Sequence, residues 1–324
     1  MTTPLTSSRT APPAGILILS LASACACRCV FCGLPETRPH TVLERDTLTT
    51  ALDGTPTAGP WREVNLTGGD PLVVPAARAL FPDVLVRRHK FARLSVNTAG
   101  VPAEAALRGL RLLEGTPLDL YVSLDGVGRL HDRIRGRAGA FTEVDRFLDE
   151  CRGLTGVQLA LTCVINRYNA EHLDAVADYA AGRGIPVSYA IVNSSDHYIR
   201  SLPMYGDVSL TQDQLDPVTD FLVRRSTQRL DDDLRAVLNG GRRQLPCRLL
   251  HEGVLVTSDG TVSICGTSQQ MILGHLDTVD GSSLTWQALL ARRSALLAKG
   301  ARATCDTCTS NCFAWRKSDE PVTA

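Results

Sequence analysis

Six short apolar runs, each rich in Val, Ile or Leu, constrain the fold of this chain more than any other feature. The runs span residues 15–21, 63–67, 92–97, 118–124, 157–164 and 187–192. Segments between them, such as 141–151 and 170–181, carry apolar residues at helical spacing. Continuous apolar runs are typical of parallel strands that are buried on both faces. Because strand and helix alternate along the chain, we predict a parallel, barrel-like α/β domain over residues 15–210.

The chain changes character on both sides of this domain. Residues 1–14 are rich in Thr, Ser and Pro and predict a disordered N-terminus. After residue 210 a helical pattern runs to Arg225, and a charged, flexible-looking piece follows over residues 229–243. We therefore assign residues 211–243 to a helical linker.

A different module is expected over residues 244–324. Two short β runs, 254–257 and 261–265, are joined through Asp259 and Gly260, and an Asp-Gly pair favours the tight turn of a hairpin. A helical pattern over residues 285–299 leads to the last cysteines. The sequence thus predicts a small C-terminal α+β domain built on a hairpin.

Charge and hydropathy exclude several classes of protein. Lys and Arg number 34, and Asp and Glu also number 34, so the net charge predicts no nucleic acid, anionic membrane or acidic partner. Residues 15–25 superficially resemble a lipoprotein signal, but only Arg9 precedes them as a basic residue and the apolar run is short for a signal peptide. No run approaches the roughly 18 to 20 apolar residues of a membrane-spanning helix. We expect a cytoplasmic protein.

The spacing of the cysteines is the main indication of function in this sequence. The chain has eleven cysteines clustered at its two ends, which favours metal binding over disulfides. Cys25, Cys29 and Cys32 form a CxxxCxxC loop directly after the first apolar run. Three thiolates can hold a [4Fe–4S] cluster and leave one iron open to another ligand. A closed zinc site is the alternative, with Cys27 or His40 as fourth ligand.

This loop resembles the three-cysteine loop of the radical S-adenosylmethionine (radical SAM) superfamily, which follows the first strand of a partial (β/α)6 TIM-like barrel. The segment from Thr67 to Pro71, which reads TGGDP, is similar to the GGEP segment of the family. The resemblance implies that Gly68, Gly69 and Asp70 contact the methionine part of the cofactor. Asp70 stands where the family has Glu, which keeps the charge but makes the side chain one methylene shorter.

Further cofactor contacts are implied at the ends of the third and fourth strands. Asn97 lies in an SVNT segment, and Ser123 begins an SLDG segment that is followed by HDRIR, ending at Arg135. The last two segments resemble the SLDG…HDxxR stretch of the subgroup with C-terminal cluster domains, in which the serine and the arginine bind the cofactor. In isolation Ser123 would be read as a turn cap and Arg135 as a surface charge.

The C-terminal cysteines resemble the auxiliary-cluster module known as SPASM or, in its shorter form, twitch. The five candidate ligands are Cys247, Cys265, Cys305, Cys308 and Cys312. The resemblance implies one auxiliary [4Fe–4S] cluster on the first four, with Cys312 as a substitute ligand, a structural thiol or a hydrogen donor. Zinc in this module is the alternative reading.

Two other groups of residues are candidates for substrate chemistry. Cys163, near the end of the fifth expected strand, is a second possible hydrogen donor, whereas a cysteine there is usually a small buried hydrophobe. The loop after the sixth strand is polar, and Asp196, His197 and Arg200 are its candidate substrate contacts; the plain alternative is a solvated loop.

The resemblance implies a radical SAM oxidoreductase or epimerase with two [4Fe–4S] clusters, S-adenosyl-L-methionine and a flavodoxin- or ferredoxin-type electron donor. Its 5′-deoxyadenosyl radical would abstract a hydrogen atom from the substrate. Because only about 14 residues precede the first strand, we expect a small natural product of sugar, aminocyclitol or nucleoside type, epimerised or oxidised at a carbinol carbon. The alternatives are radical modification of a ribosomally made peptide and, outside enzymes, a two-cluster electron carrier or a zinc-stabilised binding protein.

Overall fold

A computed structural model describes residues 15–34, 39–54, 60–192, 208–225, 229–243, 247–266, 271–276, 286–298, 305 and 308–309. Within these residues, nine strands form one sheet in the order β6-β5-β4-β3-β2-β1-β7-β8-β9. The strands are β1 (Ile16–Ser20), β2 (Trp61–Thr67), β3 (Phe91–Thr98), β4 (Leu118–Ser123), β5 (Val157–Ile165), β6 (Val187–Ile191), β7 (Gly253–Val256), β8 (Thr261–Ser263) and β9 (Ile272–His275). All six predicted strands of the barrel domain are therefore confirmed.

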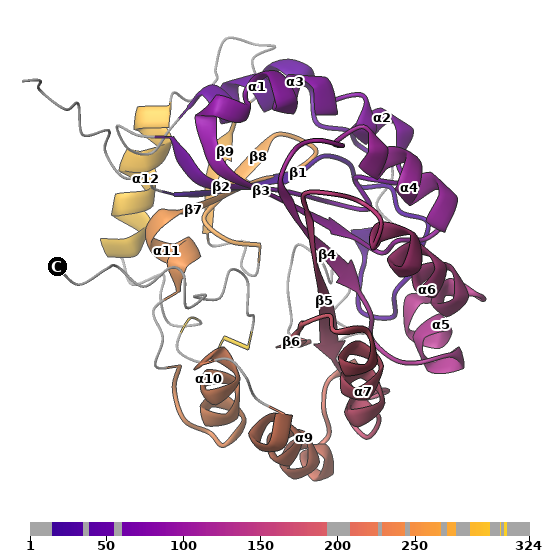
Figure 1. Cartoon of the computed structure of the whole chain (residues 1–324). Coiled ribbons are helices and arrows are strands. Elements are labelled where there is room, and N and C mark those ends of the chain that lie inside the picture. The colour runs from indigo at the N-terminus through magenta and orange to yellow at the C-terminus, as the bar shows by residue number, and fades with distance from the viewer. Residues whose placement is uncertain are drawn as a thin grey trace, which may run out of the picture.

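The sheet is an open, mostly parallel barrel, as predicted. Strands β1 to β6 pair in parallel in chain order, and β6 is an edge, so the sheet does not close on itself. Helices connect the strands and form an outer arc around the curved sheet (Figure 1). They are α1 (Arg45–Asp53), α2 (Pro75–Arg78), α3 (Phe81–Val86), η2 (Arg88–Lys90), α4 (Ala103–Arg111), α5 (Arg129–Arg135), α6 (Ala140–Cys151) and α7 (Leu173–Arg183).

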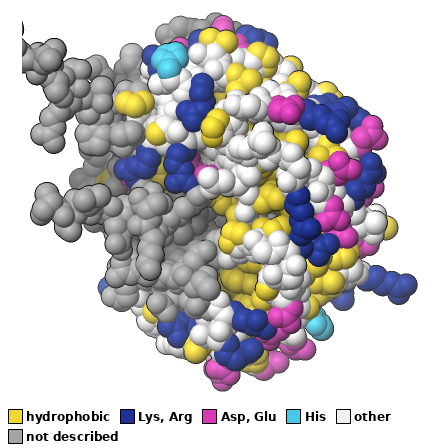
Figure 2. Space-filling view, viewed as in Figure 1, with side chains coloured by type: hydrophobic (Ala, Val, Ile, Leu, Met, Phe, Trp, Pro, Cys, Tyr) yellow, Lys and Arg dark blue, Asp and Glu magenta, His cyan; other side chains and the backbone are white. Residues whose placement is uncertain are grey.

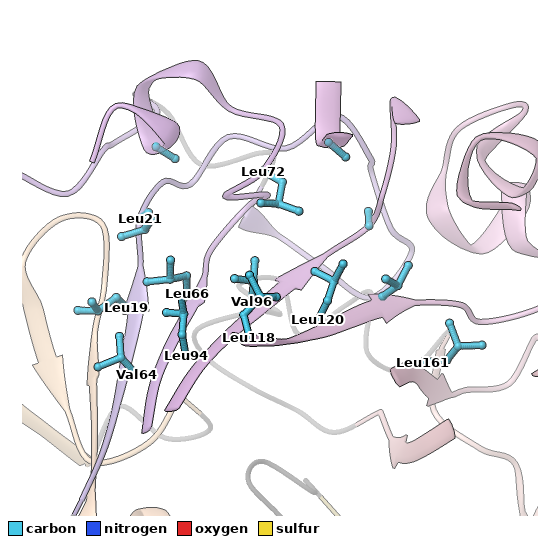
Figure 3. Close-up of a cluster of buried hydrophobic side chains, with 14 of the residues drawn as sticks. Leu19, Leu21, Val64, Leu66, Leu72, Leu94, Val96, Leu118, Leu120 and Leu161 are labelled. Atoms are coloured by element: carbon cyan, nitrogen blue, oxygen red, sulfur yellow. The ribbon is translucent and has the colours of Figure 1, made fainter. Parts of the chain in front are cut away.

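The main core lies between the sheet and these helices. Alternate residues of β1 to β5 point to the helices, and Figure 3 shows side chains such as Leu19, Leu66 and Val96 together on that face. Facing helices contribute their own apolar side, as in α4, where Ala103, Ala106, Leu107 and Leu110 are buried at helical spacing.

The opposite, inner face of the sheet is polar along β2 and β3. There the buried Ser95 hydroxyl donates to Glu63 Oε1 (2.6 Å) and accepts from Asn65 Nδ2 (2.8 Å). Buried polar groups are stable when they are hydrogen-bonded to one another in this way. The two faces of the sheet therefore differ sharply in chemistry.

The predicted C-terminal hairpin is confirmed, and it belongs to the same sheet as the barrel. β7 and β8 are antiparallel, and Gly260 in their turn has a φ of 83°, which glycine adopts readily. β7 also pairs in parallel with β1, with Leu17 opposite Val254. The proposed boundary at residue 244 thus separates stretches of chain that share one continuous sheet.

Four further helices complete the described part of the chain: α9 (Gln212–Arg225), α10 (Arg229–Leu238), α11 (Arg248–Glu252) and α12 (Trp286–Ala298). α9 and α10 lie within residues 211–243, the expected helical linker, and α10 takes up the first part of its charged piece. α10 packs against α9, and Leu234 is buried in the main core.

The surface agrees with the balanced charge of the sequence. On the face shown in Figure 2, acidic and basic side chains are interspersed along the outer rim rather than gathered by sign. Among the described helices, none is both long and apolar enough to cross a bilayer.

Candidate active site

The three-cysteine loop begins where β1 ends and is fixed there by backbone hydrogen bonds. Leu21 N–H donates to Thr67 O at the end of β2 (2.9 Å), and Ser23 N–H donates to Thr41 O (3.0 Å). Cys29 is buried, whereas Cys25 and Cys32 are half-buried, and none of the three forms a disulfide. Burial raises the pKa of Cys29 to about 12, although the nearby Arg135 lowers it. A thiol binds a metal as the thiolate, so metal binding by Cys29 must release its proton.

The glycine segment packs directly on the cysteine loop. Gly69 N–H donates to Ala22 O (2.6 Å), and Asp70 N–H donates to Ala24 O (3.2 Å). A Cβ on Gly69 would lie 1.7 Å from Ala24 O, so no side chain fits there. Gly68 has a φ of +126°, a backbone conformation that favours glycine. These two glycines therefore set how closely the loops after β1 and β2 approach.

Asp70 is fully buried and organises the ends of β2 and β3. Its carboxylate accepts hydrogen bonds from the amides of Leu72, Val73 and Ala99 and from the Thr98 hydroxyl, at 2.9 to 3.3 Å. Burial raises the pKa of Asp70 to about 6, while these hydrogen bonds lower it. In this structure the carboxylate is thus committed to the protein's own donors.

The SLDG and HDRIR segments meet at the cysteine loop through a buried ion pair. Arg135 Nη2 lies 2.7 Å from Asp125 Oδ2, and Arg135 Nη1 donates to Cys29 Sγ (3.4 Å). His131 Nδ1 accepts from the Asp125 amide (3.2 Å). Burial, reinforced by Arg135, lowers the pKa of His131 to about 3, so this imidazole is neutral at physiological pH.

The remaining predicted cofactor contacts lie at the same ends of the strands. Asn97, next to the last residue of β3, is half-buried and accepts from Asn65 Nδ2 (3.3 Å). Ser123 is the last residue of β4 and is also half-buried. The carboxyl ends of parallel strands lie side by side at one end of a barrel. β1 to β4 therefore bring four groups to that end: the cysteine loop, Gly68–Asp70, Asn97 and Ser123.

Cys163 lies elsewhere. It is fully buried and shares the helix-covered core with Leu161 and Ile165, its neighbours on the same face of β5. Asn169 Nδ2 donates to its sulfur (3.8 Å), and burial raises the pKa of this thiol well above its usual value. Its role as a hydrogen donor stays a prediction, and its position on the helix-facing side of β5 does not favour it.

The C-terminal cysteines form a second group. Cys247 is the N-cap of α11 and Cys265 follows β8, and both pack against the small apolar cluster of Ile16, Ile18, Leu249 and Leu255. Cys308 N–H donates to Cys305 O (3.3 Å), and the next residue, Thr309, donates to Ile191 O at the end of β6 (3.4 Å). Cys312, Asp196, His197 and Arg200 lie outside the described residues.

The donor chemistry of the cysteine loop fits a [4Fe–4S] cluster. Within the described residues, no three His, Cys, Asp or Glu side chains converge as ligands of one metal ion. In a cubane cluster each thiolate binds a different iron, so its ligands stand farther apart than those of a single ion. Three cysteines on one short loop leave the fourth iron open for another ligand.

Asp125 and His131 stand in the SLDG and HDRIR segments, where the sequence predicts no role for either. In the structure Asp125 pairs with the Arg135 guanidinium beside Cys29, and His131 holds the Asp125 backbone by accepting from its amide. An Asp at a strand end followed ten residues later by a buried Arg could have signalled this pair, but the burial of Arg135 is visible only in the fold.

Comparison with known proteins identifies the class. The sequence profile of the radical SAM superfamily matches residues 19–180, which is half of the chain. The chain therefore belongs to the radical SAM superfamily, as the three-cysteine loop predicted.

Two curated relatives extend the similarity. Mycofactocin maturase MftC of Mycolicibacterium smegmatis is 24% identical in an alignment of 272 residues that covers 78% of this chain and 66% of MftC. GTP 3',8-cyclase 1 of Pseudomonas aeruginosa is 28% identical in an alignment of 181 residues that covers 53% of each protein. The chain thus spans just under two thirds of the first relative and about half of the second.

Solved structures share the fold. anSMEcpe with bound AdoMet superposes with a TM-score of 0.64 at 18% identity, over 88% of this chain and 83% of anSMEcpe. Streptococcus suis SuiB bound to precursor peptide SuiA gives a TM-score of 0.58 at 14% identity, over 90% and 67% of the two chains. Both similarities extend beyond residues 19–180 into the C-terminal part, and they confirm the open-barrel fold.

Proposed function

We propose that this chain is a radical SAM enzyme that abstracts a hydrogen atom from an organic substrate and binds two [4Fe–4S] clusters. The observation that carries the proposal is the packing of Gly68–Asp70 on Ala22 and Ala24, directly before Cys25, where a Cβ on Gly69 would lie 1.7 Å from Ala24 O. An electron carrier needs no second loop packed against the segment that leads into its cluster ligands. When bound, the cluster and S-adenosylmethionine supply the radical chemistry.

The protein's own residues would hold and shield this chemistry. Cys25, Cys29 and Cys32 would ligate the first cluster, and the backbone of Gly68 and Gly69 would border the cofactor. Asp70 holds the ends of β2 and β3 together through its hydrogen bonds. Polar groups on the inner face of β2 and β3 would orient a substrate, and a C-terminal module over this face would keep water out.

For the second cluster we propose Cys247, Cys265, Cys305 and Cys308 as ligands. Its support is that Cys247 and Cys265 contact one small apolar cluster that includes Ile16 and Ile18 of β1. A cluster there could accept an electron from a product radical or organise the substrate. A flavodoxin- or ferredoxin-type protein would reduce the first cluster.

The substrate class has two candidates. The first is a small polar natural product, epimerised or oxidised at a carbinol carbon, and the hydrogen-bonding side chains of Glu63, Asn65 and Ser95 on the inner face support it. The second candidate is a peptide. Its support is that anSMEcpe and SuiB, two of the similar structures, were solved with bound peptides. Cys312 remains a candidate hydrogen donor for an epimerisation.

One experiment tests the proposal. After anaerobic reconstitution, the protein should contain about eight irons and release 5′-deoxyadenosine from S-adenosylmethionine under dithionite. The variant with Cys25, Cys29 and Cys32 all replaced by Ala should retain about half of the iron and release none. Cys151→Ala, which alters a buried thiol in α6, is the matched control and should behave as wild type. Cofactor cleavage by the triple variant would refute the assignment.

A further inference from the structure

Arg135 stands out because a buried guanidinium is aimed at the sulfur of a proposed cluster ligand. It is the last residue of α5, its side chain is only 8% exposed, and Nη1 donates to Cys29 Sγ (3.4 Å). The backbone at this end of α5 is bonded to the cysteine loop, since Arg28 N–H donates to Arg135 O and Val30 N–H to Ile134 O, both at 2.9 Å. The backbone that carries the guanidinium is therefore bonded to the same loop that the guanidinium contacts.

Asp125 fixes the direction of this guanidinium. Its Oδ2 lies 2.7 Å from Arg135 Nη2, and its Oδ1 accepts from the Val164 amide (2.8 Å). The backbone is held as well, because the Asp125 amide donates to His131 Nδ1 and the Asp125 carbonyl accepts from Asn169 Nδ2 (2.9 Å). Asp125 is fully buried, so the carboxylate has no alternative position in solvent.

We propose that Arg135, positioned by Asp125, raises the reduction potential of the cluster bound through Cys29. The inference rests on the proposed function, namely that this loop holds a [4Fe–4S] cluster. Net charge and hydrogen bonds to the sulfurs are two of the factors that set such a potential. A reduced cluster carries one more negative charge than an oxidised one, and a buried positive charge beside its ligand stabilises the reduced form.

Substitutions of Arg135 and Asp125 should shift the reduction potential of the first cluster in opposite directions. Arg135→Gln removes the positive charge, so the potential should become more negative. Asp125→Asn keeps the shape and removes the compensating negative charge, so the potential should become more positive. A residue that only supports the fold would not give shifts of opposite sign.

The test is a redox titration of the reconstituted full-length protein followed by electron paramagnetic resonance, without S-adenosylmethionine. The first cluster is recognised as the signal that the triple variant of Cys25, Cys29 and Cys32 lacks. At the wild-type midpoint potential, Arg135→Gln should lower the ratio of reduced to oxidised cluster at least tenfold, a shift of about 59 mV for one electron. Arg133→Gln, which removes an exposed charge from the same helix, is the matched control and should leave the potential unchanged.

Each outcome decides the inference. An unchanged potential in Arg135→Gln with full iron content would overturn it, as would shifts of both variants in one direction. If thermal unfolding shows that Arg135→Gln does not fold, Asp125→Asn alone tests the proposal. A reduction potential of Asp125→Asn that is not more positive than that of the wild type would then contradict it. Failure of the proposed function is separate, since wild-type protein would then lack the first signal altogether.

Discussion

At the scale of single residues, several residues of the candidate site lie against backbone atoms of the cysteine loop, so larger side chains do not fit there. Gly69 lies against the backbone of Ala24, and a Cβ on Gly136 would lie 2.1 Å from Arg28 O. Asp70 accepts hydrogen bonds from the loop after β2 and from Thr98 of β3. The cysteine loop is therefore enclosed by neighbours from the ends of β2 and α5. Its geometry depends on residues that bind no metal.

Replacing Gly69 by Ala should displace the cysteine loop, because the new Cβ would lie 1.7 Å from Ala24 O. We expect a loss of about 1–3 kcal/mol or more in the free energy of unfolding, together with loss of iron from the first cluster. Gly182→Ala is the control, since nothing lies within 4 Å of its Cβ position in α7. Urea unfolding and iron analysis check both, and full iron content in Gly69→Ala would contradict the packing argument.

His131 should make the protein less stable as the pH falls. Its pKa is about 3 in the folded chain, below the ordinary value of 6.5, so the unfolded chain binds a proton that the folded chain does not. Stability from this residue is complete above pH 6.5 and declines toward pH 3, by up to about 1.4 kcal/mol per pH unit. Urea unfolding from pH 7.5 to 5 should show a shallower decline for His131→Gln.

The control for this measurement is His172→Gln, which changes an exposed histidine. It should lose stability with falling pH as the wild type does. Equal pH dependence in the wild type and His131→Gln would show that His131 is not held neutral by burial.

At the scale of elements, α12 secures the module that carries the second group of cysteines. Arg293 of α12 is buried and donates to the carbonyls of Leu249, Leu250 and Gly253, at 2.6 to 3.1 Å. These carbonyls belong to α11 and the start of β7. Because Cys247 caps the other end of α11, the position of that cysteine depends on a residue in α12.

Arg293→Met should therefore destabilise the module and its cluster. Each buried carbonyl left without a donor costs about 1–3 kcal/mol, so we expect a lower melting temperature and loss of the iron assigned to the second cluster. Arg292→Met is the control, because Arg292 is exposed and donates only to Leu273 O (2.8 Å) among the bonds seen here. Equal iron content in the two variants would argue against this role of Arg293.

At the scale of the whole molecule, the continuous sheet joins the barrel to the C-terminal part. β7 covers the edge of β1, and the side chains of Ile16 and Ile18 pack with Leu249 and Leu255. An uncovered β1 would expose apolar side chains and unpaired backbone groups, which promotes aggregation. The two parts should therefore fold as one unit.

A chain that ends at residue 243 should consequently fail to fold cooperatively. It loses β7 to β9 and exposes Ile16 and Ile18, and each apolar side chain withdrawn from burial costs about 1.5–3 kcal/mol. A chain that ends at residue 298 keeps these strands and serves as the control. Size-exclusion chromatography and thermal unfolding distinguish the two, and a monomeric, cooperative 243-residue chain would show that the parts fold independently.

The sequence by itself determined the strand and helix order of the barrel, the hairpin and the three-cysteine loop. Apolar runs, an Asp-Gly turn and thiol spacing are local signals that do not depend on distant contacts. It did not show where the charged helix α10 packs, because its contact with α9 depends on the fold.

Only the tertiary structure decided which residues meet. Pairing of β7 with β1, burial of Arg135 between Asp125 and Cys29, and enclosure of Cys163 in the helix-covered core all join segments far apart in the chain. Such contacts follow from the register of strands and the packing of helices. The role of a polar residue depends on the partner that this packing brings next to it. Arg135 can be read from the sequence alone as a surface charge, but in the fold it is buried beside Cys29.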